Sequence, residues 1–164
     1  MLVPRAAYGN VRQIKKMDAN ILKSFFEGKT STQDLENDLE GTTIQTGKNE
    51  FRHIMIDLSE DFNININHLI MLCDAVTEGK LEPARLEEIS CGIIASECFT
   101  WSYDTEEGDL IAEVLHDWDS PSINYKLTID TISKFRHRLL TGEDIFDEND
   151  LGDPKTNNYR LTNG

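Results

Sequence analysis

Basic residues are scarce in this chain of 164 residues, which has 16 Lys and Arg against 30 Asp and Glu and a net charge of −14. Nucleic acids need clustered Lys and Arg to neutralise their phosphates, and anionic membrane surfaces attract basic segments for the same reason. The charge balance therefore predicts that the protein binds neither nucleic acid nor a membrane surface directly.

Long apolar runs are also absent. The chain starts with MLVPRAAYGN, which has no apolar stretch long enough for a signal peptide, and no window of the sequence approaches a membrane span. We therefore expect a cytoplasmic protein. The length fits one domain with one sizeable hydrophobic core.

Cysteine is limited to three residues, Cys73, Cys91 and Cys98, in segments with the pattern of a helix interior. An odd number without close pairs gives no disulfide framework and no zinc spacing. We interpret them as small buried hydrophobic residues of a reducing compartment, in preference to redox or metal-binding groups.

Known catalytic signatures are missing as well. The sequence has no glycine-rich phosphate loop, no G-x-S-x-G and no H-E-x-x-H. The run DENDLGD resembles a calcium-binding loop, but Leu151 stands where an oxygen ligand is required and Asn158 replaces the closing Glu. We therefore expect a protein that is not an enzyme and has no cofactor or metal site.

The adjacent residues His116 and Asp117 leave one enzymatic alternative open. Helical metal-dependent phosphohydrolases use such a pair with a further His and Asp, which here would be His53 or His68 together with Asp130. These ligands would have to converge within roughly 2.0 to 2.2 Å of one ion. The flanking sequence gives no sign of convergence, so a surface His at a helix end is the preferred interpretation.

The acidic excess is concentrated in the middle of the chain. Residues 1–29 have a net charge of +4, residues 30–124 of −17 and residues 125–164 of −1. Seven carboxylates and no base stand between Ser102 and Lys126: Asp104, Glu106, Glu107, Asp109, Glu113, Asp117 and Asp119. Such a surface suits a basic partner.

A helix that starts after Thr105 would gather most of these carboxylates on one face. Its apolar stripe recurs every three to four residues, at Leu110, Ile111, Val114, Leu115 and Trp118. The opposite side follows the same period and is almost wholly anionic, with Glu106, Asp109, Glu113 and Asp117. The first two favour the positive end of the helix dipole, whereas the last two repel each other. A solvated face that only keeps the protein soluble is the alternative.

Start and stop signals predict further helices over residues 18–28, 31–39 and 69–79, from Pro83 onward, and over 128–142. The helix after Pro83 has two apolar stripes, which predict burial on two sides: Leu86, Ile89 and Ile93, then Cys91, Ile94, Cys98 and Trp101. The last helix has an apolar inner face of Ile129, Ile132, Phe135 and Leu139. Its basic outer face should lie against an acidic neighbour, and it consists of Lys134, Arg136 and Arg138.

Together these patterns predict a mostly α, single-domain helical bundle over residues 1–142. Residues 42–58 fit a helix, which we choose, but Ile54, Ile56 and Leu58 also alternate like a strand, so a short strand or hairpin there stays open. The acidic residues 143–164 have little to bury and are expected to form a mobile tail.

One resemblance adds to these inferences. The residues that support this resemblance are IASECFTWSYDTEEGDLIAEVLHDWDSPSINYKLT followed by KFRHRLLTGE, and they lie within the range from His68 to Phe146. Small residues precede Phe99 and Trp101, a helix starts at Asp104-Thr105, and the pattern continues with Trp118, Pro121, Ile123, Asn124 and Thr128. This half of the chain resembles the immunity proteins of bacterial contact-dependent growth inhibition systems.

The resemblance implies a noncatalytic protein that binds and neutralises the toxic C-terminal domain of an effector delivered by a sibling cell. Such domains are frequently nucleases, which are basic because they grip phosphate, and an acidic inhibitor can occupy that surface and associate quickly. The expected toxin-binding residues are the seven carboxylates given above. An acidic adaptor of a different basic partner remains an alternative.

Overall fold

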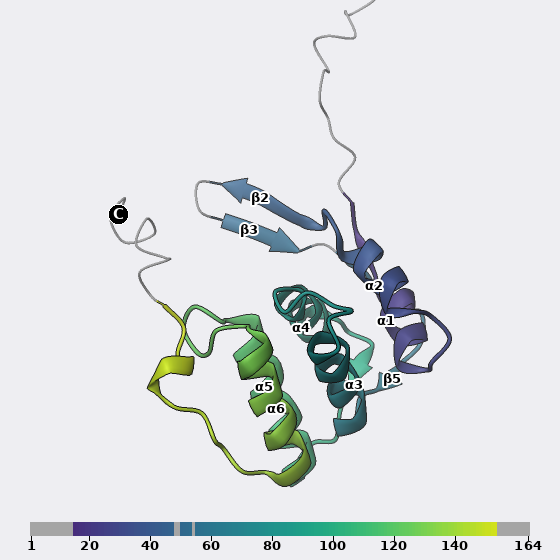
Figure 1. Ribbon diagram of the computed structural model, residues 1–164. Helices are drawn as coiled ribbons and strands as arrows, with labels where there is room; N and C mark the ends of the chain where they lie inside the picture. Colours follow the sequence, from purple (N-terminus) through teal and green to yellow (C-terminus); the bar gives the residue numbers. More distant parts are fainter. Residues whose placement is uncertain (1–14, 48–49, 54, 154–164) are drawn as a thin grey trace, which may run out of the picture.

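The computed structural model of the chain describes residues 15–47, 50–53 and 55–153 (Figure 1). Within these residues six α-helices dominate: α1 Ala19–Phe26, α2 Thr32–Leu39, α3 Ile66–Thr77, α4 Arg85–Ala95, α5 Glu106–Asp119 and α6 Ile129–Thr141. The predicted mostly α architecture is confirmed. None of the helices in these ranges combines the length and the hydrophobicity that a bilayer-crossing segment needs.

The last four helices pack as two pairs, α3 with α6 and α4 with α5. Helices α1 and α2 pack against each other at one edge of this group, where α2 also contacts α4 (Figure 1). Every helix turns a buried apolar stripe toward the shared core. The pair α3–α6 joins segments far apart in the sequence, whereas α4–α5 and α1–α2 are pairs of consecutive helices.

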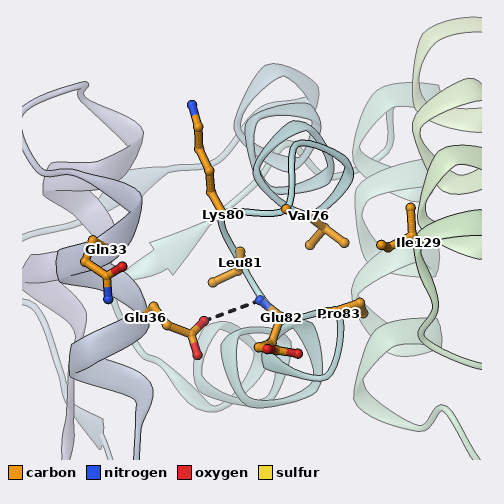
Figure 2. Close-up of a pocket in the computed structure, with 9 residues that line it drawn as sticks. Gln33, Glu36, Val76, Lys80, Leu81, Glu82, Pro83 and Ile129 are labelled. Carbon is orange, nitrogen blue, oxygen red and sulfur yellow. Dashed lines mark hydrogen bonds between the residues drawn. The ribbon is translucent and has the colours of Figure 1, made fainter.

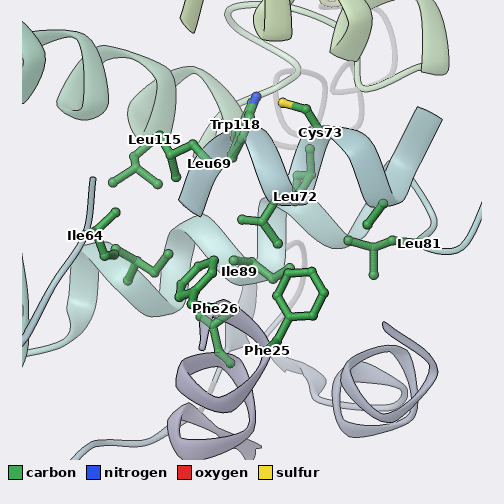
Figure 3. Close-up of a cluster of buried hydrophobic side chains, with 14 of the residues drawn as sticks. Phe25, Phe26, Ile64, Leu69, Leu72, Cys73, Leu81, Ile89, Leu115 and Trp118 are labelled. Carbon is green, nitrogen blue, oxygen red and sulfur yellow. The ribbon is translucent and has the colours of Figure 1, made fainter. Parts of the chain in front are cut away.

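The core is built around large side chains that are fully buried. Trp118 of α5 meets Phe135 of α6 edge-on, with ring centroids 5.8 Å apart. Figure 3 shows Trp118 above residues of α3 and α4, with Phe25 and Phe26 of α1 closing the opposite side. Burying each large apolar side chain contributes about 1.5 to 3 kcal/mol.

The cysteines are only partly as expected. Cys73 is fully buried, whereas Cys91 and Cys98 are half-buried, and all three thiols are free. Burial raises the pKa of Cys73 to about 12 and, with Asp119 nearby, that of Cys91 to about 11. Because the thiolate is the reactive form, these two thiols stay protonated at neutral pH and their reactivity is low.

The predicted helix ends are confirmed at several caps. The side chains of Asp18, Ser31, Thr105 and Thr128 accept hydrogen bonds from backbone N–H groups in the first turns of α1, α2, α5 and α6. After α6, Gly142 takes the left-handed conformation with φ 78°. Residues with a side chain rarely adopt this conformation, so glycine ends the helix here.

The predicted helix over residues 42–58 is wrong, and the hairpin alternative is confirmed. Strand β2 Thr43–Gly47 pairs antiparallel with β3 Glu50–His53 (Figure 1). Strand β4 Met55–Ile56 pairs in parallel with β1 Met17–Asp18. The run TTIQT is rich in β-branched residues, which favour strands over helices. That local preference outweighed the weak helical spacing.

The helix after Pro83 is shorter than predicted, because α4 ends at Ala95. Ser96 Oγ accepts hydrogen bonds from the N–H groups of Cys98 and Phe99 and donates to Asp57 at 2.6 Å. The chain then enters β6 Phe99–Thr100, which pairs in parallel with β5 Phe62–Asn63. The second stripe predicted for this helix is therefore broken, since Cys98 and Trp101 lie beyond its end.

The first residue of α6 departs from the predicted inner face. Ile129 is 54% exposed, whereas Ile132, Phe135 and Leu139 are buried. The expected acidic neighbours of the outer face are present, because Lys134 pairs with Asp150, Arg136 with Asp74 and Arg138 with Glu113 and Asp117.

Residues 143–153, which we call the C-terminal strap, lie against α6. The Phe146 ring stacks on Tyr125 with centroids 4.1 Å apart, and Asp150 is buried beside Lys134. Backbone hydrogen bonds from Lys126 N to Asp150 O and from Gly152 N to the loop after α5 extend the contact. The expectation that the chain after α6 has little to bury is corrected for the strap, and residues 154–164 lie outside the described residues.

Candidate functional site

Helix α5 has the amphipathic arrangement that its sequence predicts. Its inner stripe is buried at Ile111, Val114, Leu115 and Trp118, and Leu110 is half-buried. The opposite side exposes Glu106, Asp109 and Glu113. Thr105 Oγ1 accepts a hydrogen bond from Gly108 N at 3.0 Å, which fixes the start of the helix next to the first two carboxylates.

A groove of about 480 Å³, the acidic groove, opens beside the first half of α5. Its lining includes four carboxylates of α5, namely Glu106, Glu107, Asp109 and Glu113. The rest of the lining comes from α3, α5 and the end of α6, with Ile66, Leu110, Leu139 and Gly142. A long cationic side chain fits this chemistry, because its methylene stem prefers apolar contacts and its charged end prefers carboxylates.

Two of the predicted carboxylates are paired with one base. Arg138 of α6 reaches Glu113 Oε2 with Nη2 at 2.6 Å and Asp117 Oδ2 with Nη1 at 3.2 Å. Glu113 keeps 60% of its side chain exposed, whereas that of Asp117 is 18% exposed. Burial raises the pKa of Asp117 in spite of the nearby guanidinium. The repulsion expected between Glu113 and Asp117 is therefore offset by Arg138, and both residues help to hold α5 against α6.

Two other predicted carboxylates, Glu107 and Asp119, form contacts within the fold. Glu107 Oε1 accepts a hydrogen bond from Ile66 N at 3.2 Å and joins the starts of α5 and α3. Asp119 is half-buried and hydrogen-bonds to Cys91 of α4. These carboxylates are only partly available to a partner.

The remaining three, Asp104, Glu106 and Asp109, are exposed, and within the described part of the chain their carboxylates have no ion pair. They lie at the N-terminal end of α5 or just before it. The accessible negative charge is therefore concentrated at one end of the helix instead of extending along its whole length.

A second groove of about 410 Å³ lies between α2 and the loop from α3 to α4 (Figure 2). Glu36 of α2 faces the loop there, accepts from Glu82 N at 3.4 Å and pairs with Arg85 at 2.8 Å. The lining also includes Lys80 and the apolar Leu81. Because both signs of charge are present and Glu36 is already paired, this groove is less suited to a basic partner than the acidic groove.

Among the described residues, the side chains that the phosphohydrolase alternative requires do not come together. His116 is exposed, Asp117 is bound by Arg138, and Asp130 pairs with Lys134 at 3.6 Å. His68 Nδ1 accepts from Asn65 N in the cap of α3. Across the described ranges no three His, Cys, Asp or Glu residues form a group that could hold a metal ion, and the His53 side chain lies outside them.

Part of this site was not predictable from the sequence. The apolar lining from Ile66 and Leu139 depends on how α3 and α6 pack, and the exposed Tyr103 before α5 follows no periodic pattern. The basic face of α6 was visible in the sequence, but its specific partners were not. Comparisons of the chain with protein-family models, with curated proteins and with solved structures give no match.

Proposed function

We propose that this protein acts in the cytoplasm as an immunity protein, which binds the toxic C-terminal domain of a contact-dependent growth inhibition effector and neutralises it. The observation that carries the proposal is the unpaired charge of Asp104, Glu106 and Asp109 next to the acidic groove. The resemblance of His68 to Phe146 to such immunity proteins supports it.

The partner is expected to be a basic domain, most simply a nuclease. A net charge of −14 attracts a basic partner over distances of about the Debye length, near 8 Å at physiological salt, and speeds its association. Asp104, Glu106 and Asp109 have no ion pair among the described residues, so they can pair with the toxin without breaking a contact seen there. Charge of this kind raises the rate of association and selects for basic partners.

The acidic groove supplies a place for a specific contact. A Lys or Arg from the toxin can lay its aliphatic stem along Leu110 and Leu139 and bring its charged end to Glu106 or Asp109. A base inserted in this way is no longer available for phosphate. Inhibition follows because the nuclease surface that holds nucleic acid is covered.

The test is a pull-down of the tagged protein with the C-terminal domain of the effector encoded beside its gene, with growth of the producing cells recorded in parallel. Capture together with restored growth supports the proposal. Absence of capture and of rescue contradicts it, as does the absence of an effector gene at that position.

A further inference from the structure

The turn before α5, Ser102 to Thr105, holds an aromatic ring in solvent. Tyr103 is 79% exposed, and its ring contacts no other aromatic ring among the residues that the structure describes. Tyr125 shows the opposite arrangement, because its ring packs on Phe135 and Phe146. An aromatic side chain that is not used inside the fold is available for contact outside it.

The backbone of this turn is held in a conformation that side chains rarely adopt. Asp104 has φ 57°, and it is the one described residue other than glycine with a positive φ. Such strained positions persist only when the surrounding structure fixes them, and they are concentrated at functional sites.

Two contacts fix the turn. Thr105 caps α5 through its bond from Gly108 N. In addition, a Cβ on Gly108 would lie 1.6 Å from the carbonyl oxygen of Ser102, so the turn lies directly against the first turn of the helix and only glycine fits there. Tyr103 is therefore presented from a rigid backbone, and little main-chain freedom is lost when a partner binds it.

The surroundings of Tyr103 decide which group it can bind. Asp104 and Glu106, close to it in the sequence, are exposed and without an ion pair among the described residues. A cation is attracted to the face of an aromatic ring, and nearby carboxylates attract the same cation through their charge. Tyr is also among the residues that most often dominate interface energies.

We propose that Tyr103 is the aromatic anchor of the partner interface, with an Arg or Lys of the basic toxin domain stacked on its ring and attracted there by the nearby carboxylates of Asp104 and Glu106. This inference rests on the proposed function and adds to it the residue and the chemical group that hold the complex together. The net charge governs how fast the partners meet, whereas the anchor, together with the contact in the acidic groove, governs how slowly they separate.

The chain offers a matched control at the other end of α5. Ile123 is 78% exposed, nearly the same as Tyr103, and it lies in the loop after the helix. Replacing Ile123 by the shorter Ala should leave both the stability of the fold and the binding of the partner unchanged. Three variants follow: Tyr103→Leu removes the aromatic ring, Tyr103→Phe keeps the ring without the hydroxyl, and Ile123→Ala is the control.

The experiment measures association and dissociation rates of the full-length variants with the effector C-terminal domain, together with thermal unfolding of each variant. We expect Tyr103→Leu to dissociate about tenfold faster or more, the change typical of an interface anchor, with association and its salt dependence unchanged. Tyr103→Phe should stay within about twofold of the unmodified protein, because the ring face is retained. Thermal unfolding should not change, since the side chain is exposed.

Each contrary result would contradict a different part of the proposal. Dissociation of Tyr103→Leu at the original rate overturns the anchor and leaves the proposed function standing. A loss in Tyr103→Phe as large as in Tyr103→Leu overturns the cation stacking, because the hydroxyl would then be the contact. An equal loss in Ile123→Ala also contradicts a specific anchor at Tyr103. Failure of the unmodified protein to bind the toxin domain removes both proposals.

Discussion

Arg138 Nη2 lies 2.6 Å from Glu113 Oε2 and connects the exposed side of α5 to α6. The same guanidinium reaches Asp117, and only 14% of the Arg138 side chain is exposed. One base therefore offsets two carboxylates that stand four residues apart and would otherwise repel each other. Part of the acidic face is thus a structural contact between helices.

Replacing Arg138 by Met should destabilise the fold by roughly 1 to 3 kcal/mol, because the half-buried Asp117 loses its partner. Burial already raises the pKa of Asp117, and loss of the guanidinium should raise it further. A raised carboxyl pKa penalises the folded state above that pKa, and the penalty disappears as the pH falls through it. The loss of unfolding free energy in the variant, measured by urea unfolding, should therefore be largest at neutral pH. It should decrease as the pH falls toward 3.8, the ordinary pKa of Asp.

Arg136→Met is the control for this prediction. The Arg136 pair with Asp74 leaves 41% and 40% of the two side chains exposed, so its loss should cost about 0 to 1 kcal/mol. Equal losses in the two variants would show that the burial of Asp117 has no energetic effect.

Reversing two charges that have no ion pair in the described ranges, with Glu106→Lys and Asp109→Lys together, should slow association with the toxin domain by roughly tenfold and weaken its salt dependence. Glu113 is unsuited to this test because Arg138 holds it. Both substitutions oppose the helix dipole, which costs about 0.3 to 1 kcal/mol at each site, so unfolding must be measured alongside binding.

The matched control is the double variant Glu40→Lys and Glu60→Lys, which changes the net charge equally at exposed positions outside α5. If both double variants slow association to the same extent, only net charge matters and the site at the start of α5 is wrong.

Truncating Trp118 to Ala should cost about 3 to 5 kcal/mol, because its side chain is fully buried and would leave a large cavity. Its Nε1 has no acceptor in the described structure, and an unsatisfied buried donor is itself unfavourable by about 1 to 3 kcal/mol. Trp118→Phe removes that group and keeps most of the contact, so denaturant unfolding should show a much smaller loss. An alanine variant of full stability that no longer binds the toxin would move Trp118 to the interface.

Asp150→Asn should loosen the C-terminal strap. Asp150 Oδ2 accepts from Lys134 Nζ at 2.7 Å and from Asp147 N at 2.8 Å, and the bond from Lys134 lowers the pKa of Asp150. A lowered carboxyl pKa stabilises the fold above the ordinary value of 3.8, and this contribution is lost as the pH falls through the folded-state pKa. The protection of the Lys126 and Gly152 amides from hydrogen exchange, relative to the intrinsic rate at the same pH, should fall in the variant at neutral pH and in the unmodified protein only in strong acid.

The exposed Glu148 provides the comparison for the strap, since Glu148→Gln changes the charge of the same segment by the same amount. Equal exchange in both variants would mean that total charge, and not the Asp150–Lys134 contact, holds the strap in place.

Helices with a capping residue, an apolar stripe and a stop signal were predictable from the sequence. For α5 and α6, Thr105, Thr128 and Gly142 mark boundaries through contacts within a few residues. The end of α4 was not predictable, because the Ser96 turn that stops it is bound by Asp57, 39 residues earlier. The strap was misjudged for a similar reason, since Phe146 finds its partner Tyr125 only in the folded chain.

In the candidate site, too, local features were predictable from the sequence and contacts between distant residues were not. Helical periodicity placed Glu106, Asp109 and Glu113 on one face of α5. It could not show that Glu113 shares a base with Asp117, because Arg138 stands 25 residues beyond Glu113. Tyr103 lies in a loop, where no period indicates which side chains face the solvent.

The pairing of helices has a consequence for how the chain folds, because the pair α4–α5 is enclosed in sequence by the pair α3–α6. Residues 96–105 join the inner pair, whereas residues 78–128 separate the outer pair. Closing the longer loop directly costs about 1.4 kcal/mol more in chain entropy. Prior docking of α4 on α5 shortens the free chain that α3 and α6 must close, so the middle of the sequence is expected to form the nucleus on which the two outer helices condense.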